Sequence, residues 1–316
     1  MKIYFLEVEN EDEFLLKSKY PRARIFGSKL DEDEIIKNCL DAEVLCVFIH
    51  SRISQKVINA LPNLKLIVTR SVGYDHIDLT AARQKNVVVC NVPDYGSHVI
   101  AEHVFALLLS GLRHVNLGGL RVVQDLDFSY SGLRGTALKG KTLGIVGAGR
   151  IGKIVARIGS LGFLMNVLAF DPLEDSDVAL ENHFQYTDLE TLLSKSDIIS
   201  LHCPLLQETK HLIDENAIKK MKNGAVIVNT SRGGVIDTNA LVEALKSKKI
   251  SCAFLDVLEH ENNLNKDRDL LDLKNVIITP HIAFYADDSM GKMYSESFLS
   301  IDSFRNGEFI VNKVES

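Results

Sequence analysis

The sequence predicts an α/β protein with two Rossmann-like or flavodoxin-like domains, each built on a parallel sheet. Short runs rich in β-branched residues alternate with stretches of helical periodicity, which is typical of βαβ units. The chain has 316 residues, enough for about two domains. One strand-like run also leads directly into a glycine-rich motif of the kind that binds dinucleotides.

Five strands are expected in the first part of the chain, separated by stretches such as 31–40 and 78–86 that can each pack one face on a sheet. These strands are predicted at residues 2–8, 23–27, 44–50, 64–72 and 87–92. A helical segment follows at residues 98–115, and its apolar residues cover so much of its surface that we expect it to be deeply buried.

A second series of six strands, with helices between them, matches a complete dinucleotide-binding sheet. The six are predicted at residues 141–147, 166–172, 197–203, 224–230, 251–257 and 275–281. The tail, residues 286–316, predicts one helix that is too short to fold alone and would pack on the first domain. We therefore expect a discontinuous substrate domain of residues 1–97 plus 286–316, a dinucleotide-binding Rossmann domain of residues 98–285, and an active site in the cleft between them.

Composition narrows the class of function. Hydrophobic residues make up 46% and charged residues 25%, and the net charge of −6 argues against a nucleic-acid or anionic-membrane surface. No apolar stretch approaches the ~18 residues of a membrane span, and the first residues lack the apolar region of a secretory signal. The five cysteines are scattered without metal-binding spacing, which predicts reduced thiols, a cytoplasmic protein and no bound metal.

The clearest local motif is GxGxxG, formed by Gly147, Gly149 and Gly152 between a predicted strand and a predicted helix. The first glycine permits a tight turn, the second lets the backbone approach a pyrophosphate, and the third allows close helix–strand packing. The next strand ends in Asp171, where a carboxylate binds the adenosine ribose hydroxyls. With Glu174 and Asp175 nearby, it would repel a 2′-phosphate, so the predicted cofactor is NAD rather than NADP.

Polar side chains follow the later strands of this sheet, at the edge where α/β proteins bind ligands. Arg232 can hold a carboxylate or a polarised carbonyl, and His281 can give or take a proton near neutral pH. Glu261 can orient the imidazole and stabilise its cationic form. Together they suit hydride transfer between NADH and a 2-oxo acid. Taken singly, Arg232 could be a surface charge beside a helix, Glu261 part of a solvated loop, and His281 a packing residue. The other residues noted after these strands are His202, Cys203, Pro204, Thr230, Ser231, Asp256 and Glu259.

Over nearly its whole length the sequence resembles the D-isomer-specific 2-hydroxyacid dehydrogenases. Several long motifs carry this resemblance in the expected order. They are TRSVGYDHIDLTAA, NVPDYGSHVIAEHVFALLL, LGIVGAGRIGKIVA, LHCPLLQETKHLID, MKNGAVIVNTSRGGVIDTNALVEAL, FLDVLEHE and TPHIAFY.

The resemblance implies roles for individual residues. Arg232 would be the substrate-binding arginine, Glu261 the carboxylate and His281 the acid/base. Glu261 fits better than Glu259, because the family's glutamate lies five residues after the aspartate of the DV motif, here Asp256. The implied cofactor contacts are Arg150 and Ile151 at the pyrophosphate, Cys203 and Pro204 at the adenosine, Thr209, Thr230 and Ser231 nearby, and Asp256 at the nicotinamide carboxamide. The backbone at Val72 and Gly73 would receive the substrate carboxylate.

The resemblance also bears on the substrate. His281 is followed by Ile282, Ala283, Phe284 and Tyr285, and the aromatic pair is similar to the D-lactate and D-2-hydroxyisocaproate dehydrogenase branch. Phe284 would border the substrate side chain, and pyruvate is the expected oxo acid. In place of a proline that is frequent in the family, Asn262 follows Glu261, in an unusually polar loop. The family also suggests a homodimer, with residues 98–135 as a contact, and His103 is expected to be structural.

Other functions stay open within the resemblance. A glyoxylate or hydroxypyruvate reductase would share the same three residues, with Phe284 the discriminator. Formate dehydrogenases typically place glutamine beside the histidine, so Glu261 argues against them. An NAD-sensing binding protein without turnover is the alternative of a different class.

Overall fold

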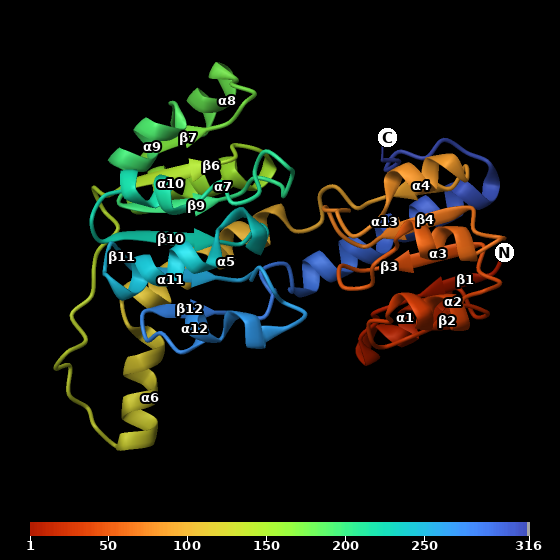
Figure 1. Cartoon of the computed structure of the whole chain (residues 1–316), viewed down its shortest axis with the longest axis horizontal. Helices are drawn as coiled ribbons and strands as arrows, with labels where there is room; N and C mark the ends of the chain where they lie inside the picture. Colours follow the sequence, from red (N-terminus) through yellow and green to blue (C-terminus); the bar gives the residue numbers. More distant parts are fainter. Residues whose placement is uncertain (315–316) are drawn as a thin grey trace. The chain divides into compact units, whose positions relative to one another are not determined.

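The computed structural model describes residues 1–314, which divide into two compact units (Figure 1). Unit 1 comprises Met1–Tyr95 and the chain from Ala286 onward, and unit 2 comprises Gly96–Tyr285. All strand pairings within the two sheets of this described chain are parallel. The predicted α/β class with two parallel sheets is therefore confirmed.

Unit 1 is a five-stranded sheet in the order β2-β1-β3-β4-β5, the order of a flavodoxin-like fold. Its strands are β1 (Ile3–Phe5), β2 (Arg24–Ile25), β3 (Val44–Val47), β4 (Leu66–Thr69) and β5 (Val88–Cys90). Its helices are η1 (Asn10–Asp12), α1 (Glu13–Lys19), α2 (Glu32–Asn38), α3 (Gln55–Ala60), α4 (Leu79–Gln84) and the C-terminal α13 (Asp287–Asn306).

Successive strand residues of unit 1 point to opposite faces of the sheet, and both faces are covered. Leu45 and Ile67 pack in one core with residues of α2, α3 and α4. Cys46 and Val68 pack in the other with residues of α1 and with Tyr294 of α13. Burial on both faces explains why these strands read as continuous apolar runs.

Unit 2 is a seven-stranded sheet in the order β12-β11-β10-β9-β6-β7-β8. Its strands are β6 (Thr142–Val146), β7 (Asn166–Phe170), β8 (Gln185–Tyr186), β9 (Ile198–Leu201), β10 (Ala225–Asn229), β11 (Ile250–Leu255) and β12 (Val276–Ile278). From β6 the strand order runs to β7 and β8 on one side, and from β9 it runs to β10, β11 and β12 on the other. The order therefore switches between the parallel neighbours β6 and β9, which is where doubly wound sheets bind ligands. All six predicted strands are present, and β8 is an additional two-residue strand at the edge of the sheet that was not predicted.

Helices pack on both faces of the unit 2 sheet. One core joins the sheet to α10 and α11, and the other joins it to α5 and α7. Aspartates cap the N-termini of several of these helices through their side-chain oxygens, for example Asp237 at α11. The helices of unit 2 are α5 (Ser97–Leu112), α6 (Val115–Asp125), α7 (Arg150–Arg157), the π-helical turn η2 (Ile158–Gly162), α8 (Ser176–Glu181), α9 (Leu189–Lys195), α10 (Glu215–Lys220), η3 (Gly233–Val235), α11 (Thr238–Lys246), η4 (Leu264–Asp267) and α12 (Arg268–Leu271).

The helical segment expected at residues 98–115 corresponds to α5, but α5 ends at Leu112. His114 then adopts a left-handed backbone conformation with φ of 53°, and α6 begins after it with no buried residue. The expected burial therefore applies to α5, whereas α6 stands away from the sheet of its unit (Figure 1). Within residues 1–314, we find no helix whose length and apolar character would suffice to cross a bilayer.

Candidate active site

The glycine motif lies where β6 turns into α7, and two of its glycines are required by close contacts. Gly147 has φ of +96°, and a Cβ added there would lie 2.7 Å from the backbone nitrogen of Cys203. A Cβ on Gly152 would lie 2.0 Å from the carbonyl oxygen of Gly147. Any larger residue at either position would push the loop away from the sheet.

Gly149 differs from its neighbours, because a Cβ added there would meet nothing within 4 Å. It is exposed and caps the N-terminus of α7, whose first residues are the exposed Arg150 and the partly buried Ile151. The helix therefore begins at an exposed backbone position, and the helix dipole favours negative charge there. The loop fits the pyrophosphate of a dinucleotide.

Asp171, at the end of β7, ties the glycine loop to the next strand. Its carboxylate accepts the N–H of Ala148 at 2.8 Å and the N–H of Leu173 at 2.9 Å. Because a carboxylate has about four acceptor positions, two bonds leave capacity for ribose hydroxyls.

The segment after β9 forms a compact loop beside the glycine motif. Cys203 is buried, and this burial raises the pKa of its thiol to about 11, so it remains protonated. Thr209 closes the loop, since its hydroxyl donates to the carbonyl of the exposed Pro204 at 2.6 Å and accepts the N–H of Leu206 at 2.7 Å.

Two buried polar atoms at this edge of the sheet have no hydrogen-bond partner among the described residues: the Thr230 hydroxyl and His202 Nδ1. The other ring nitrogen of His202 lies 2.8 Å from the Ser200 hydroxyl. Burial lowers the pKa of His202 to about 3, so its ring is neutral. Buried polar groups normally have partners, so these two atoms favour a polar ligand at the ends of β9 and β10.

Arg232 follows β10 in a turn that is organised by Asn229. The buried Asn229 side chain accepts the N–H and the hydroxyl of Ser231 at 3.0 and 2.8 Å and donates to the carbonyl of Arg232 at 2.9 Å. The guanidinium of Arg232 donates to the carbonyl of Ser231 at 2.8 Å. The sequence prediction missed Asn229, although an asparagine that ends a buried strand is a usable signal for such a turn.

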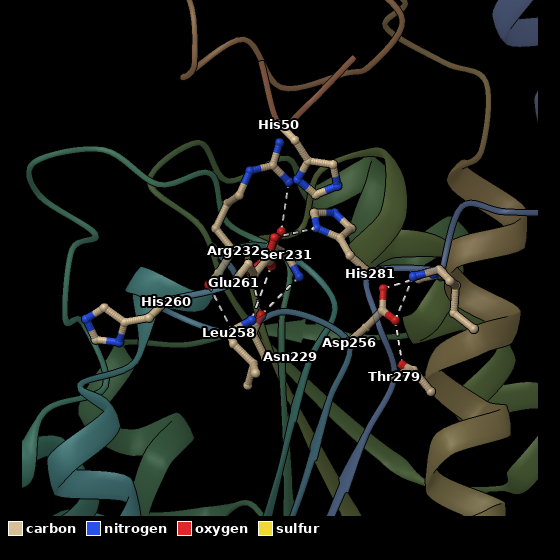
Figure 2. Close-up of polar contacts among 12 residues, drawn as sticks. His50, Asn229, Ser231, Arg232, Asp256, Leu258, His260, Glu261, Thr279 and His281 are labelled. Carbon is tan, nitrogen blue, oxygen red and sulfur yellow. Dashed lines mark hydrogen bonds and ion pairs between the residues drawn. The ribbon is translucent and has the colours of Figure 1, made fainter. Parts of the chain in front are cut away.

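Glu261 and His281 come from the ends of neighbouring strands and meet directly. His281 Nδ1 lies 3.1 Å from Glu261 Oε2, and the side chains are 17% and 28% exposed, respectively. The other oxygen of Glu261 accepts the N–H of Leu258 at 3.2 Å. Figure 2 shows the side chains of Arg232, Glu261 and His281 pointing toward one another. The three residues that the sequence singled out are therefore brought together within unit 2.

His281 has a left-handed backbone conformation, with φ of 55°. Its N–H donates to the carbonyl of Asp256 at 2.8 Å and to that of Thr279 at 3.0 Å. The Asp256 carboxylate accepts the next two N–H groups, of Ile282 at 2.9 Å and of Ala283 at 2.8 Å. An L-residue is costly in this conformation, so these bonds hold the turn that presents the imidazole.

The Asp256 carboxylate is only 1% exposed and has further partners (Figure 2). The Thr279 hydroxyl donates to it, and His103 Nε2 lies 3.5 Å from it and 3.1 Å from the Thr279 hydroxyl. Burial alone would raise the pKa of Asp256, but hydrogen bonds from His103, Thr279 and the two N–H groups lower it below its ordinary value. Both oxygens are thus engaged inside unit 2, and an additional contact from Asp256 to a cofactor stays a prediction.

Phe284 packs against the catalytic candidate itself. Its ring lies edge-on to the His281 ring, with 6.3 Å between centroids, and the residue is 9% exposed. Tyr285 contacts Phe284 but is exposed. The apolar surface beside His281 is therefore supplied by Phe284.

Val72 and Gly73 belong to unit 1, in the loop after β4. The carbonyls of this loop are held inside the unit: Ser71 accepts from the Val92 N–H at 3.0 Å, and Val72 from the Asn91 side chain at 2.8 Å. The carbonyl of Gly73 accepts the Ser71 hydroxyl at 2.6 Å. Since N–H and C=O of one peptide point in opposite directions, the amides of this loop point away from those partners.

Comparison with known proteins identifies the family of the chain. Residues 105–283 match the description "D-isomer specific 2-hydroxyacid dehydrogenase, NAD binding domain". The chain is 36% identical to the D-lactate dehydrogenase of Escherichia coli over 89% of each chain, and 39% identical to a hydroxypyruvate reductase of Thermotoga maritima over 82% of this chain and 83% of the relative. A crystal structure of D-lactate dehydrogenase from Aquifex aeolicus, complexed with NAD and lactic acid, superposes with a TM-score of 0.91 at 35% identity over 99% of each chain. The chain belongs to the D-isomer specific 2-hydroxyacid dehydrogenase family, with an NAD-binding domain of the doubly wound type.

Proposed function

We propose that the protein is an NAD-dependent dehydrogenase that interconverts pyruvate and D-lactate. The observation that carries this proposal is the pairing of His281 Nδ1 with Glu261 at 3.1 Å, with Arg232 directed to the same point. This arrangement supplies a general acid that a carboxylate orients, beside a cation for the substrate, at the ligand-binding edge of a sheet that carries an open glycine loop.

The cofactor is assigned to the carboxyl edge of the unit 2 sheet. Its pyrophosphate binds over Gly147, Gly149 and Gly152 at the start of α7, and Asp171 holds the adenosine ribose. When bound, NADH supplies the hydride that is added to C2 of the oxo acid. The remaining residues that we assign to the cofactor site are Arg150, Ile151, Cys203, Pro204, Thr209, Thr230, Ser231 and Asp256.

The chain's own residues bind the substrate and move the proton. Arg232 binds the substrate carboxylate or polarises its carbonyl through the guanidinium, and the backbone N–H groups of Val72 and Gly73 bind the carboxylate. As hydride arrives at C2, negative charge develops on the carbonyl oxygen, and Nε2 of protonated His281 delivers a proton to it. Glu261 stabilises the positive charge of the ring before the transfer and fixes its orientation. Oxidation of the hydroxy acid runs the same steps backwards from neutral His281.

Pyruvate is favoured by the surface that Phe284 forms beside His281. An apolar ring suits the methyl group of pyruvate better than the hydroxyl group of hydroxypyruvate. Because one relative is a hydroxypyruvate reductase, reduction of hydroxypyruvate is the second candidate activity.

The test is NADH oxidation with a panel of oxo acids: pyruvate, 2-oxobutyrate, 4-methyl-2-oxopentanoate, phenylpyruvate, glyoxylate, hydroxypyruvate and oxaloacetate. NADPH runs in parallel, and the product is analysed for chirality. We expect pyruvate to have the highest kcat/KM with NADH and to give the D-isomer. Preference for hydroxypyruvate or glyoxylate would select the second candidate. Tight NADH binding with no turnover of any oxo acid would leave an NAD-binding protein without this activity.

A homodimer is also proposed, through α6 and the segment after it. None of the residues of α6 is buried, and the apolar side chains of Val123, Leu126 and Phe128 are 77%, 89% and 92% exposed. So much apolar surface is typical of an interaction site. Light scattering after gel filtration should give twice the chain mass, and Phe128→Glu should give the monomer. A monomeric wild type would contradict this assignment.

A cytosolic location is proposed because Cys39, Cys46, Cys90, Cys203 and Cys252 are all free thiols. Fractionation of cells that express the full chain tests this location.

A further inference from the structure

Glu259 lies two residues before Glu261 but has entirely different partners. One oxygen of its carboxylate lies 2.7 Å from Nε2 of His211. The other accepts the Thr238 hydroxyl at 2.8 Å and the Thr238 N–H at 3.4 Å. The two glutamates that compete in the sequence therefore separate: Glu261 pairs with His281, and Glu259 pairs with His211 and Thr238.

These partners come from three different loops at the carboxyl edge of the unit 2 sheet. His211 follows β9, Thr238 begins α11 after β10, and Glu259 follows β11. The N–H of His211 also donates to the carbonyl of Gly234 at 2.9 Å. The Glu259 carboxylate thus links the loop after β11, which also carries Glu261, to the loops after β9 and β10.

A direct contact joins the same loops next to Arg232. A Cβ added to Gly233 would lie 1.9 Å from the carbonyl carbon of Leu258 and 2.3 Å from the nitrogen of Glu259. The turn after Arg232 therefore packs directly against the backbone of Leu258. The N–H of Leu258 in turn donates to the Glu261 carboxylate at 3.2 Å. Movement of the Glu259 backbone would displace both the arginine turn and the Glu261 carboxylate.

The charge of Glu259 suits this role. Its side chain is 20% exposed. Burial alone would raise its pKa, but hydrogen bonds from His211 and Thr238 lower the pKa below its ordinary value. The group is therefore a carboxylate at neutral pH, and its hydrogen bonds are of the stronger, charge-assisted kind.

We propose that Glu259, held by His211 and Thr238, is a positioning residue that sets the distance between Arg232 and the Glu261–His281 pair. It does not touch the substrate and acts through the loop backbone. This inference rests on the proposed function, because the distance it controls matters only if these three residues act on one substrate.

The experiment compares Glu259→Ala, Glu259→Gln and His211→Asn with wild type in the full-length protein, by pyruvate reduction, NADH binding and thermal unfolding. We expect kcat for Glu259→Ala to fall roughly 10- to 100-fold, as for a small misplacement of catalytic groups, with NADH affinity unchanged. Glu259→Gln, which keeps an oxygen acceptor for Thr238, should recover part of the loss. His211→Asn should also lower kcat, and the Glu259→Ala, His211→Asn double variant should be little worse than Glu259→Ala, because the two residues share one interaction.

His260 provides a matched control in the same loop. Its Nδ1 lies 2.8 Å from the buried Asp267, so His260→Asn also breaks a histidine–carboxylate pair, but one that does not reach the loop of Arg232. We expect His260→Asn to lower the unfolding temperature without a comparable loss of kcat. If His211→Asn and Glu259→Ala keep wild-type kcat and KM, the positioning role is overturned while the proposed function stands. The same holds if His260→Asn loses as much kcat as they do. If the wild type reduces no oxo acid, the proposed function is overturned and this inference with it.

Discussion

His281 Nδ1 lies 3.1 Å from Glu261 Oε2, and this contact determines which ring nitrogen of the imidazole can meet a substrate. With Nδ1 directed to the carboxylate, Nε2 points to the opposite side of the ring. The backbone of His281 is left-handed, with φ of 55°, and the Asp256 carboxylate holds the two N–H groups that follow it. The acid/base candidate is therefore oriented from both its side chain and its backbone.

Glu261→Gln tests the side-chain part of this arrangement. A glutamine can still hydrogen-bond the ring, but it does not stabilise the positive charge that the histidine carries before proton transfer. We expect kcat for pyruvate reduction to fall roughly 10²-fold. Steady-state rates measure this loss. An unchanged kcat would show that Glu261 has no part in the chemistry.

Asp256→Asn tests the backbone part. Asparagine keeps one oxygen acceptor, but its NH2 group replaces the other oxygen and faces either the N–H of Ala283 or the N–H of Ile282 and the Thr279 hydroxyl. We therefore expect a loss of about 1–3 kcal/mol in the free energy of unfolding at neutral pH. Because the pKa of Asp256 is lowered in the folded state, the stability it adds is present above the unfolded pKa and is lost as pH falls through the folded pKa. The stability difference between wild type and variant should therefore shrink below about pH 4. Urea unfolding at neutral and acidic pH measures it, and a difference that is constant down to strongly acidic pH would contradict this assignment.

Asp171→Ser tests cofactor selection. The variant loses the charge that repels a 2′-phosphate and the acceptor for the ribose, so we expect KM for NADH to rise roughly 10- to 100-fold and NADPH to become a usable cofactor. The carboxylate also holds the N–H of Ala148 at 2.8 Å, so part of the loss will come from the glycine loop. The ratio of kcat/KM for the two cofactors isolates selection from this shared loss. A ratio equal to that of wild type would exclude Asp171 as the selecting residue.

The sequence predicted the parallel sheets and the grouping of Arg232, Glu261 and His281, because both follow from local patterns. Apolar runs identify strands buried on two faces, and in a parallel sheet the residues after successive strands meet at one edge. The end of α5 at Leu112 was not predicted, since apolar residues continue beyond it on the exposed α6.

The supporting contacts could not be predicted, because each joins residues far apart in the chain. The Asp256–His103 contact and the Glu259–His211 contact depend on how loops pack above the sheet. The left-handed conformation of His281 also depends on tertiary bonds, since nothing in TPHIAFY requires it. Local patterns thus placed the reactive side chains, and only the folded loops show what holds them.

The most direct test of the acid/base assignment is the turnover of His281→Gln with pyruvate and NADH, measured beside the NADH affinity of the same variant. A glutamine can occupy the position and bond Glu261, but it cannot transfer a proton. We predict a loss of roughly 10²- to 10⁴-fold in kcat with NADH affinity close to that of wild type. Turnover close to that of wild type would contradict the role of His281 and, with it, the proposed mechanism.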